Sequence, residues 1–260
     1  MSVSATLSLA YGAHARQRVD VFVPEGAGTA LVCCIGGGWW ADGRCEAQRA
    51  FALQLAERGF AVANLGHRPL GDGARTGDEV LHDLVEAVNK AIEEAGVLGF
   101  EGRSVALLGH GSGSLAALDL AARVARKHAV RAVVACGVLA TLEPGHGTAA
   151  AHQPACDRFA MGRHRDLSPL YLDPAHIPAL LLVHGDADGD VPLSQAQALQ
   201  AHAAASGEPV ELAVLAGAGH RFAEDALARP ARDALDRVAA FLGEHAREPQ
   251  GGDFAFGRAV

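Results

Sequence analysis

The sequence predicts an α/β fold in which a mostly parallel β-sheet carries helices on both faces. Three observations lead to this prediction. Short apolar segments alternate with amphipathic segments of helical length along most of the chain, as in doubly wound sheets. Several of the short segments are continuously apolar, as strands buried on both faces must be. The 260 residues, 50% of them hydrophobic, are enough for one domain with a sizeable core.

The expected strands begin near the N-terminus. Residues 19–23 combine β-branched and aromatic side chains, which favours an extended segment in an antiparallel ribbon. Residues 30–35 read ALVCCI, a continuously apolar run typical of a buried parallel strand. Similar runs predict further strands at residues 60–65, 104–108, 130–136, 179–183 and 210–215.

Helices are expected between these strands. In residues 78–95, Leu81, Leu84 and Val88 recur at helical spacing and form one apolar face. Comparable amphipathic patterns, with Pro230 suited to the first turn of the last helix, extend this prediction to other segments. The expected helices cover residues 44–57, 78–95, 114–127, 194–205 and 231–246.

The alternation of strands and helices predicts one α/β domain over residues 1–246. Residues 139–175 interrupt the alternation, because they are rich in His, Pro, Gly and Asp and show weak periodicity. Insertions at this point project over the carboxyl ends of the strands, where open α/β sheets bind ligands, so we expect a short lid there. Residues 247–260 are expected to form a C-terminal tail.

Composition excludes several classes of function. A net charge of −8 and a pI near 5.9 argue against a nucleic-acid partner. No apolar run approaches the roughly 18 residues of a membrane helix, and residues 1–16 lack the pattern of a secretory signal. The five cysteines show no paired spacing and indicate reduced thiols in a cytoplasmic protein. The sequence is compatible with a homodimer without determining the oligomeric state.

Four polar or glycine-rich motifs follow four of the predicted strands. Because parallel strands end at the same edge of a sheet, the motifs are expected to meet there. An acidic residue followed by histidine, both after a glycine-rich strand–helix turn, is the order of a Ser-Asp-His hydrolase triad. The motifs are IGGGW at residues 35–39, GHGSG at 109–113, HGDAD at 184–188 and GAGH at 217–220.

These motifs resemble those of the α/β-hydrolase superfamily, in particular the bacterial carboxylesterase and lipase branch with its hormone-sensitive-lipase-like and kynurenine-formamidase-like members. That branch reads HGGGW, GHSAGG, HGxxDxxVP and GxGHGF, where this chain reads IGGGW, GHGSGS, HGDADGDVP and GAGHRF. The resemblance extends over most of the chain, from about residue 19 to residue 242. It implies the α/β-hydrolase fold and an esterase-like site.

The resemblance also implies roles for individual residues. Asp188 would be the acid that orients His220, and His220 would be the general base. Gly37, Gly38 and the backbone N–H of Ser112 would form an oxyanion hole, in which each donor contributes about 3–4 kcal/mol in a working enzyme. Asp186 and Asp190 compete for the acid role, but Asp188 has the offset from the His184-Gly185 pair that the branch shows.

Two departures from the branch fall in the site. Gly111 occupies the nucleophile position and cannot form an acyl-enzyme, and Ile35 replaces the histidine of the oxyanion loop. A milder departure is His67-Arg68 in place of a Tyr-Arg pair. Ser112 could substitute for the missing serine only if the turn were remodelled, since its side chain should point into the start of the helix. Ser114 lies further into the helix, and capping of the helix start is the simpler explanation of both serines.

Other side chains near the motifs are candidate ligands of a substrate or a metal. Trp39 and Trp40 could line the substrate pocket, although packing beneath the loop explains Trp40 equally well. No cofactor is expected, since the chain lacks a P-loop and an early GxGxxG motif. Potential metal ligands gather in the lid segment, but their spacing matches no familiar zinc pattern, so no metal is predicted. These residues are His146, His152, Cys156, Asp157 and His164.

Three functions therefore compete. The first is hydrolysis of small carboxylic esters or amides, with water or Ser112 in place of the missing serine; such activity would be slow, since sites lacking a triad member retain only about 10³–10⁴-fold over water. The second is a catalytically degenerate hydrolase that binds a small molecule or a partner. The third is a non-hydrolytic enzyme in which a His–Asp base catalyses elimination or decarboxylation.

Overall fold

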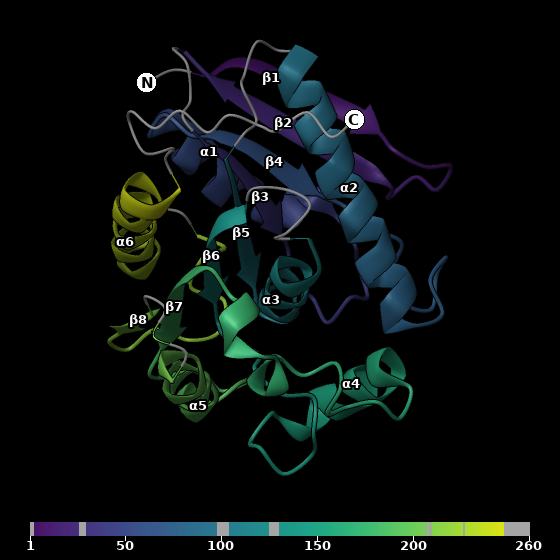
Figure 1. Ribbon diagram of the computed structural model, residues 1–260, viewed down its shortest axis with the longest axis vertical. Helices are drawn as coiled ribbons and strands as arrows, with labels where there is room; N and C mark the ends of the chain where they lie inside the picture. Colours follow the sequence, from purple (N-terminus) through teal and green to yellow (C-terminus); the bar gives the residue numbers. More distant parts are fainter. Residues whose placement is uncertain are drawn as a thin grey trace, which may run out of the picture.

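A computed structural model describes residues 3–25, 30–97, 104–124, 130–205, 207, 210–225 and 227–246. These residues form an eight-stranded sheet of order β1-β2-β4-β3-β5-β6-β7-β8 (Figure 1). The strands are β1 (Val3–Ala10), β2 (Arg18–Pro24), β3 (Leu31–Ile35), β4 (Ala61–Leu65), β5 (Val105–His110), β6 (Val130–Cys136), β7 (Ala179–Gly185) and β8 (Val210–Leu215). The α-helices are α1 (Arg49–Glu57), α2 (Gly77–Val97), α3 (Ser112–Val124), α4 (Gln153–Ala160), α5 (Leu193–Ala204) and α6 (Arg229–His245).

The sheet is mostly parallel, as expected. Strands β3 to β8 pair in parallel, whereas β1 and β2 form an antiparallel ribbon that joins the sheet through β4. The sequence prediction omitted β1. Its sequence, VSATLSLA, alternates apolar and polar residues and lies at an edge of the sheet, so it lacks the continuous apolar run that identifies the buried strands.

Element boundaries differ from the predictions mainly at the N-terminal ends of helices. The helix expected at residues 44–57 consists of a 3-10 turn, Cys45–Gln48, followed by α1. Helix α3 begins at Ser112, two residues before the expected start, because the glycine-rich turn leads directly into it. The predicted tail, residues 247–260, lies outside the described residues.

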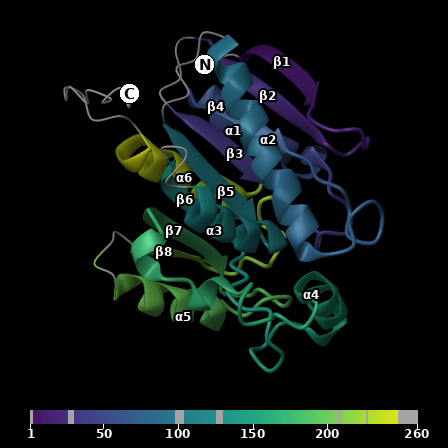
Figure 2. The same cartoon turned by 45° about the vertical axis from the view of Figure 1, so that its right-hand side comes forward.

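Two hydrophobic clusters hold the layers together, one on each face of the sheet (Figure 2). Alternate residues of β3 point in opposite directions, so Leu31 and Cys33 belong to one cluster and Val32 and Cys34 to the other. Helices α2, α3 and α5 contribute to the first cluster, and α1 and α6 to the second. The central parallel strands, β3 to β7, are buried almost throughout, so the motifs that follow β3, β5 and β7 stand on a rigid support.

The connection between β6 and β7 contains α4 and three 3-10 turns. Helix α4 lies beyond the end of the sheet at which the parallel strands finish (Figure 2). The side chain of Arg163, which follows α4, forms an ion pair with Asp78 of α2 at 2.8 Å. This connection contains residues 139–175, for which the sequence predicts a lid, and its His152 contacts Trp39 and Asp190 in the motif-bearing loops.

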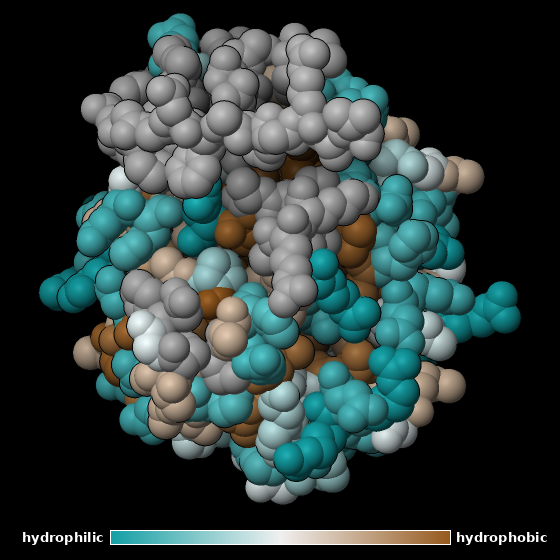
Figure 3. Space-filling view, in the orientation of Figure 1, coloured by the Kyte–Doolittle hydropathy of each residue, from teal (hydrophilic) through white to brown (hydrophobic). Residues whose placement is uncertain are grey.

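None of the described helices is both long and apolar enough to cross a bilayer. On the face shown in Figure 3, hydrophobic residues appear as small patches among hydrophilic ones. Large hydrophobic side chains that are exposed within the described residues, namely Met161, Val214 and Leu227, belong to different segments.

Candidate active site

A tight turn between β5 and α3 carries the GHGSG motif. A Cβ atom at Gly109 would lie 2.0 Å from the carbonyl oxygen of Gly113, and one at Gly113 would lie 2.3 Å from the carbonyl oxygen of Ile35. Backbone atoms cannot yield at such distances, so both positions require glycine. These close approaches bring the first turn of α3 against the end of β3.

Gly111 stands at the apex of this turn for a different reason. Its φ is +56°, which keeps the backbone in the left-handed region. A Cβ atom there would meet the imidazole of His220, 2.9 Å from Nε2, before any backbone atom. The side chain that Gly111 lacks would therefore point directly at His220.

His220 is held by Asp188. The Nδ1–H of His220 donates to Asp188 Oδ2 at 2.8 Å, while Asp188 Oδ1 accepts the N–H groups of Asp190 and Val191, each at 2.9 Å. Burial alone would raise the pKa of Asp188, but hydrogen bonds from His184, His220 and the backbone lower it well below its ordinary value. Asp188 is therefore a carboxylate, and Nε2 of His220 faces Gly111.

A second imidazole supports the acid. Nδ1 of His184 accepts the N–H of Val138 at 3.0 Å, so the proton of neutral His184 is on Nε2. This Nε2 lies 3.0 Å from the carbonyl oxygen of Val191 and 3.2 Å from Asp188 Oδ2. His184 and His220 therefore both approach Oδ2 of Asp188, and His184 helps to fix the carboxylate that orients His220.

His110 lies behind His220 and is neutral. The two rings are 5.3 Å apart, and burial together with the neighbouring His220 lowers the pKa of His110 to about 3. A charged imidazole at this depth would be poorly solvated and close to another imidazole. His110 therefore contributes an uncharged wall to the site.

The glycine loop after β3 is fixed by Ser112. The backbone N–H of Trp39 donates to Ser112 Oγ at 2.9 Å, and Trp39 itself has a φ of +55°. Within the described residues, the N–H groups of Gly37 and Gly38 have no acceptor in the chain. The hydroxyl of Ser112 therefore binds the glycine loop and does not bind His220. The N–H groups of Gly37 and Gly38 remain available to a ligand.

Ser114 and the other aspartates of the HGDAD motif have partners elsewhere. Ser114 Oγ donates to the carbonyl of Gly111 at 2.7 Å and accepts the N–H of Leu139 at 3.0 Å. Asp186 accepts the N–H of Gly217, while Asp190 pairs with His152. Neither of these aspartates contacts His220.

Trp39 forms a wall of the site together with the lid. Its ring stacks on His152, with centroids 4.1 Å apart, and lies nearly parallel to His220 at 6.3 Å. Trp40 lies elsewhere: its side chain is buried and stacks on Phe159 of α4 at 3.9 Å. The expectation that Trp40 lines the pocket is therefore corrected, because its left-handed backbone turns its ring away from that of Trp39 and into the core.

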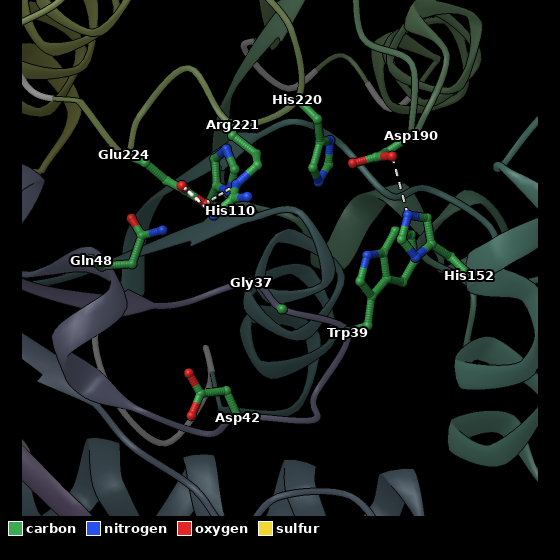
Figure 4. Close-up of a pocket in the computed structure, with 11 residues that line it drawn as sticks. Gly37, Trp39, Asp42, Gln48, His110, His152, Asp190, His220, Arg221 and Glu224 are labelled. Carbon is green, nitrogen blue, oxygen red and sulfur yellow. Dashed lines mark hydrogen bonds and ion pairs between the residues drawn. The ribbon is translucent and has the colours of Figure 1, made fainter.

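These groups surround a pocket of about 340 Å³ (Figure 4). This volume lies within the range of small-molecule sites. Several lining residues had no sequence signal, since they belong to no motif and meet only in the folded chain. The lining comprises Gly37, Gly38, Trp39, Asp42, Gln48, His110, His152, Asp190, His220, Arg221 and Glu224.

The potential ligands of the lid segment do not converge on a metal site. His152 pairs with Asp190, and His164 pairs with Asp157 at 2.8 Å. Cys156 is buried in the core, where burial raises its pKa to about 12. Across the described residues, no group of three or more His, Cys, Asp and Glu side chains is placed to hold a metal ion.

Solved structures with similar folds include several esterases. An esterase from Mycobacterium marinum superposes with a TM-score of 0.80 at 19% identity, covering 92% of this chain and 81% of that one. A hyperthermophilic esterase from Pyrobaculum calidifontis gives 0.79 at 17% identity, covering 92% and 85%. A truncated carbohydrate esterase from gut microbiota gives 0.76 at 18% identity, covering 94% and 98%. At these identities the likeness establishes the α/β-hydrolase fold.

Sequence comparison leads to the family. A probable isoprenylcysteine alpha-carbonyl methylesterase of Arabidopsis thaliana is 28% identical over 109 residues, which cover 41% of this chain but only 25% of that protein. The model of the prolyl oligopeptidase family matches residues 73–248, which is more than half of the chain. The matched region includes the GHGSG turn, the HGDAD loop and the GAGH loop. The chain therefore belongs to the prolyl oligopeptidase family and has the α/β-hydrolase fold.

Proposed function

We propose that this protein hydrolyses small carboxylic esters or amides by activating water with His220 in place of a serine nucleophile. The observation that carries the proposal is the orientation of His220, whose Nε2 faces Gly111 while Nδ1 is held by Asp188. Gly111 supplies no hydroxyl, so the nucleophile that this base can activate is a water molecule bound at Nε2 of His220, a residue of the pocket lining. Esterases among the similar structures and the Arabidopsis methylesterase support the substrate class.

The chemistry follows the positions of these groups. Water attacks the substrate carbonyl carbon while His220 Nε2 accepts a proton from it. The oxyanion that forms takes hydrogen bonds from the N–H groups of Gly37 and Gly38. Collapse breaks the bond to the leaving oxygen or nitrogen, which receives the proton from His220. The products are a carboxylic acid and an alcohol or amine, with no covalent intermediate on the protein.

The test uses p-nitrophenyl acetate and butyrate with four proteins: the parent, His220→Ala, Ser112→Ala and Gly111→Ser. We expect slow turnover by the parent without a burst, loss to background in His220→Ala, and reduced but measurable turnover in Ser112→Ala. A fluorophosphonate should leave the parent unmodified by intact mass and label Gly111→Ser. Equal rates for the parent and His220→Ala would overturn the proposal.

A second candidate, small-molecule binding without turnover, is favoured by one observation. The imidazole of His220 lies so close to Gly111 that a side chain there would need His220 to move, since Cβ would be 2.9 Å from Nε2. His220 thus occupies space that a nucleophile at position 111 would need, and Ile35 replaces the histidine of the oxyanion loop. Both features are expected in a protein that has lost catalysis. This candidate predicts a ligand-dependent rise in melting temperature with no product; an unchanged melting temperature across acids, esters and amides would contradict it.

A further inference from the structure

The charged groups that line the pocket already have partners within the chain. Glu224 pairs with Arg221 at 2.6 Å, and Asp190 pairs with His152 at 3.1 Å. Asp42 likewise pairs with Arg44, just outside the pocket. Arg221, the one arginine of the described lining, is therefore neutralised as well. An ionic ligand would find no unpaired opposite charge here, so the lining favours a neutral ligand.

Among the uncharged polar side chains of the described lining, the enclosed Nε2 of His110 and the carboxamide of Gln48 lack such a partner. Gln48 is only 7% exposed, and its carboxamide makes no hydrogen bond with any described residue. It is the N-cap residue of α1, but its side chain does not cap the helix. In Figure 4 the carboxamide is directed inward, toward Arg221 and Glu224, on the side of Gly37 opposite to Trp39.

A largely buried side chain whose carboxamide faces the pocket without a partner sets a condition on the ligand. Water can satisfy Gln48 in the empty pocket, but an apolar ligand that displaces this water would leave its donors and acceptor unsatisfied. A ligand with a neutral hydrogen-bonding group at this place restores the lost bonds. Sites built in this way discriminate strongly against analogues that lack the group.

We propose that Gln48 is a specificity residue of this pocket, binding a neutral polar group, a hydroxyl or a carboxamide, on the part of the ligand that lies away from Trp39. The proposal rests on the proposed function only for the idea that this ligand is a substrate. The preferred substrates are then short esters or amides that carry a second, uncharged polar group.

Binding can be tested without turnover. Titration calorimetry would compare butyramide with 3-hydroxybutyramide, 4-hydroxybutyramide, succinamide and the anion succinamate, using the whole protein. We expect at least one neutral polar amide to bind about tenfold more tightly than butyramide, the ratio expected when a buried hydrogen bond is lost. Succinamate should bind more weakly than succinamide.

Two variants locate the preference. Gln48→Leu, which keeps the size of the side chain, should reduce the preference to about twofold or less. Gln54→Leu, on the same helix but outside the pocket lining, should retain it. If Gln48→Leu does not fold, as judged by circular dichroism, Gln48→Met replaces it. No preference in the parent, a preference kept without Gln48, or tighter binding of succinamate would each overturn the proposal.

The same ligands separate this proposal from the proposed function. Tight binding of the polar amides without hydrolysis of p-nitrophenyl esters would support the role of Gln48 and contradict catalysis. Hydrolysis with equal kcat/KM for p-nitrophenyl butyrate and p-nitrophenyl 3-hydroxybutyrate, together with equal binding of the amides, would support catalysis and contradict the role of Gln48.

Discussion

At the scale of single residues, Gly111 differs from the glycines beside it. Gly109 and Gly113 are required by backbone atoms that approach within 2.3 Å of where a Cβ would lie. At Gly111 the nearest atom is the side chain of His220, and the required φ is the left-handed value that such elbows also impose on other residues. The backbone of a nucleophile elbow has therefore been kept although its nucleophile is absent.

Replacement of Gly111 by alanine tests this interpretation. The left-handed φ costs a non-glycine residue about 1–2 kcal/mol, and the new methyl group must also displace His220. Gly217→Ala is the matched control, because Gly217 has a φ of +69° with open space around it. Urea denaturation should show a larger loss for Gly111→Ala than for Gly217→Ala. Equal losses would mean that His220 does not fill the space beside position 111.

At the scale of elements, the lid, the glycine loop and the loop after β7 are joined through one side chain. His152, at the start of the lid helix, stacks on Trp39 and pairs with Asp190. Asp190 also donates its N–H to Asp188. Since Ile35 cannot support the glycine loop as a histidine would, Ser112 and His152 hold Trp39 in place instead.

This arrangement predicts an optical signal. The chain has two tryptophans, and Trp40 is buried against Phe159. Removal of the stacked imidazole in His152→Ala should increase the emission of Trp39 and shift it to longer wavelength, because the ring becomes more exposed to water. In a Trp39→Phe background the same substitution should leave the spectrum unchanged. A spectral change that persists in that background would show that His152 does not contact Trp39.

At the scale of the whole molecule, stability depends on keeping buried imidazoles uncharged. Burial lowers the pKa of His110 to about 3 and also lowers the pKa of His67. In the unfolded chain these groups bind protons near the ordinary histidine value of about 6.5. Above about pH 6.5 these imidazoles are neutral in both states, and their protonation does not reduce the free energy of unfolding. As the pH falls below that value, the unfolded state takes up protons that the folded state does not, so the free energy of unfolding decreases.

The lowered pKa of His110 predicts how the free energy of unfolding depends on pH. Between about pH 6.5 and pH 3, His110 should lower the free energy of unfolding by up to about 1.4 kcal/mol per pH unit. His110→Gln should therefore unfold with a shallower dependence on pH over that range. His82→Gln, at an exposed position on α2, is the control. An identical slope for the parent and His110→Gln in urea denaturation would contradict a neutral, buried His110.

Much of the fold could be predicted from local pattern. Buried apolar strands such as β3 and β5 lie within two residues of the predicted positions, and β6 and β8 have the expected bounds although each contains a charged residue. The prediction omits the edge strand β1 because it lacks a continuous apolar run; its alternation of apolar and polar residues is the pattern of a half-buried strand. The site could be predicted only where a motif marks it, as at Asp188 and His220, whose separation of 32 residues closes to 2.8 Å in the folded chain.

The sequence by itself determined the α/β class, the order of the motifs and the glycine at position 111, because these are written in local composition and spacing. Tertiary structure alone decided that His220 turns toward Gly111, that Ser112 binds the glycine loop, and that Trp40 packs in the core. It also placed Gln48, unpartnered, in the pocket. The reason is physical: the direction and partners of a side chain depend on elements far away in the sequence, which only packing brings together.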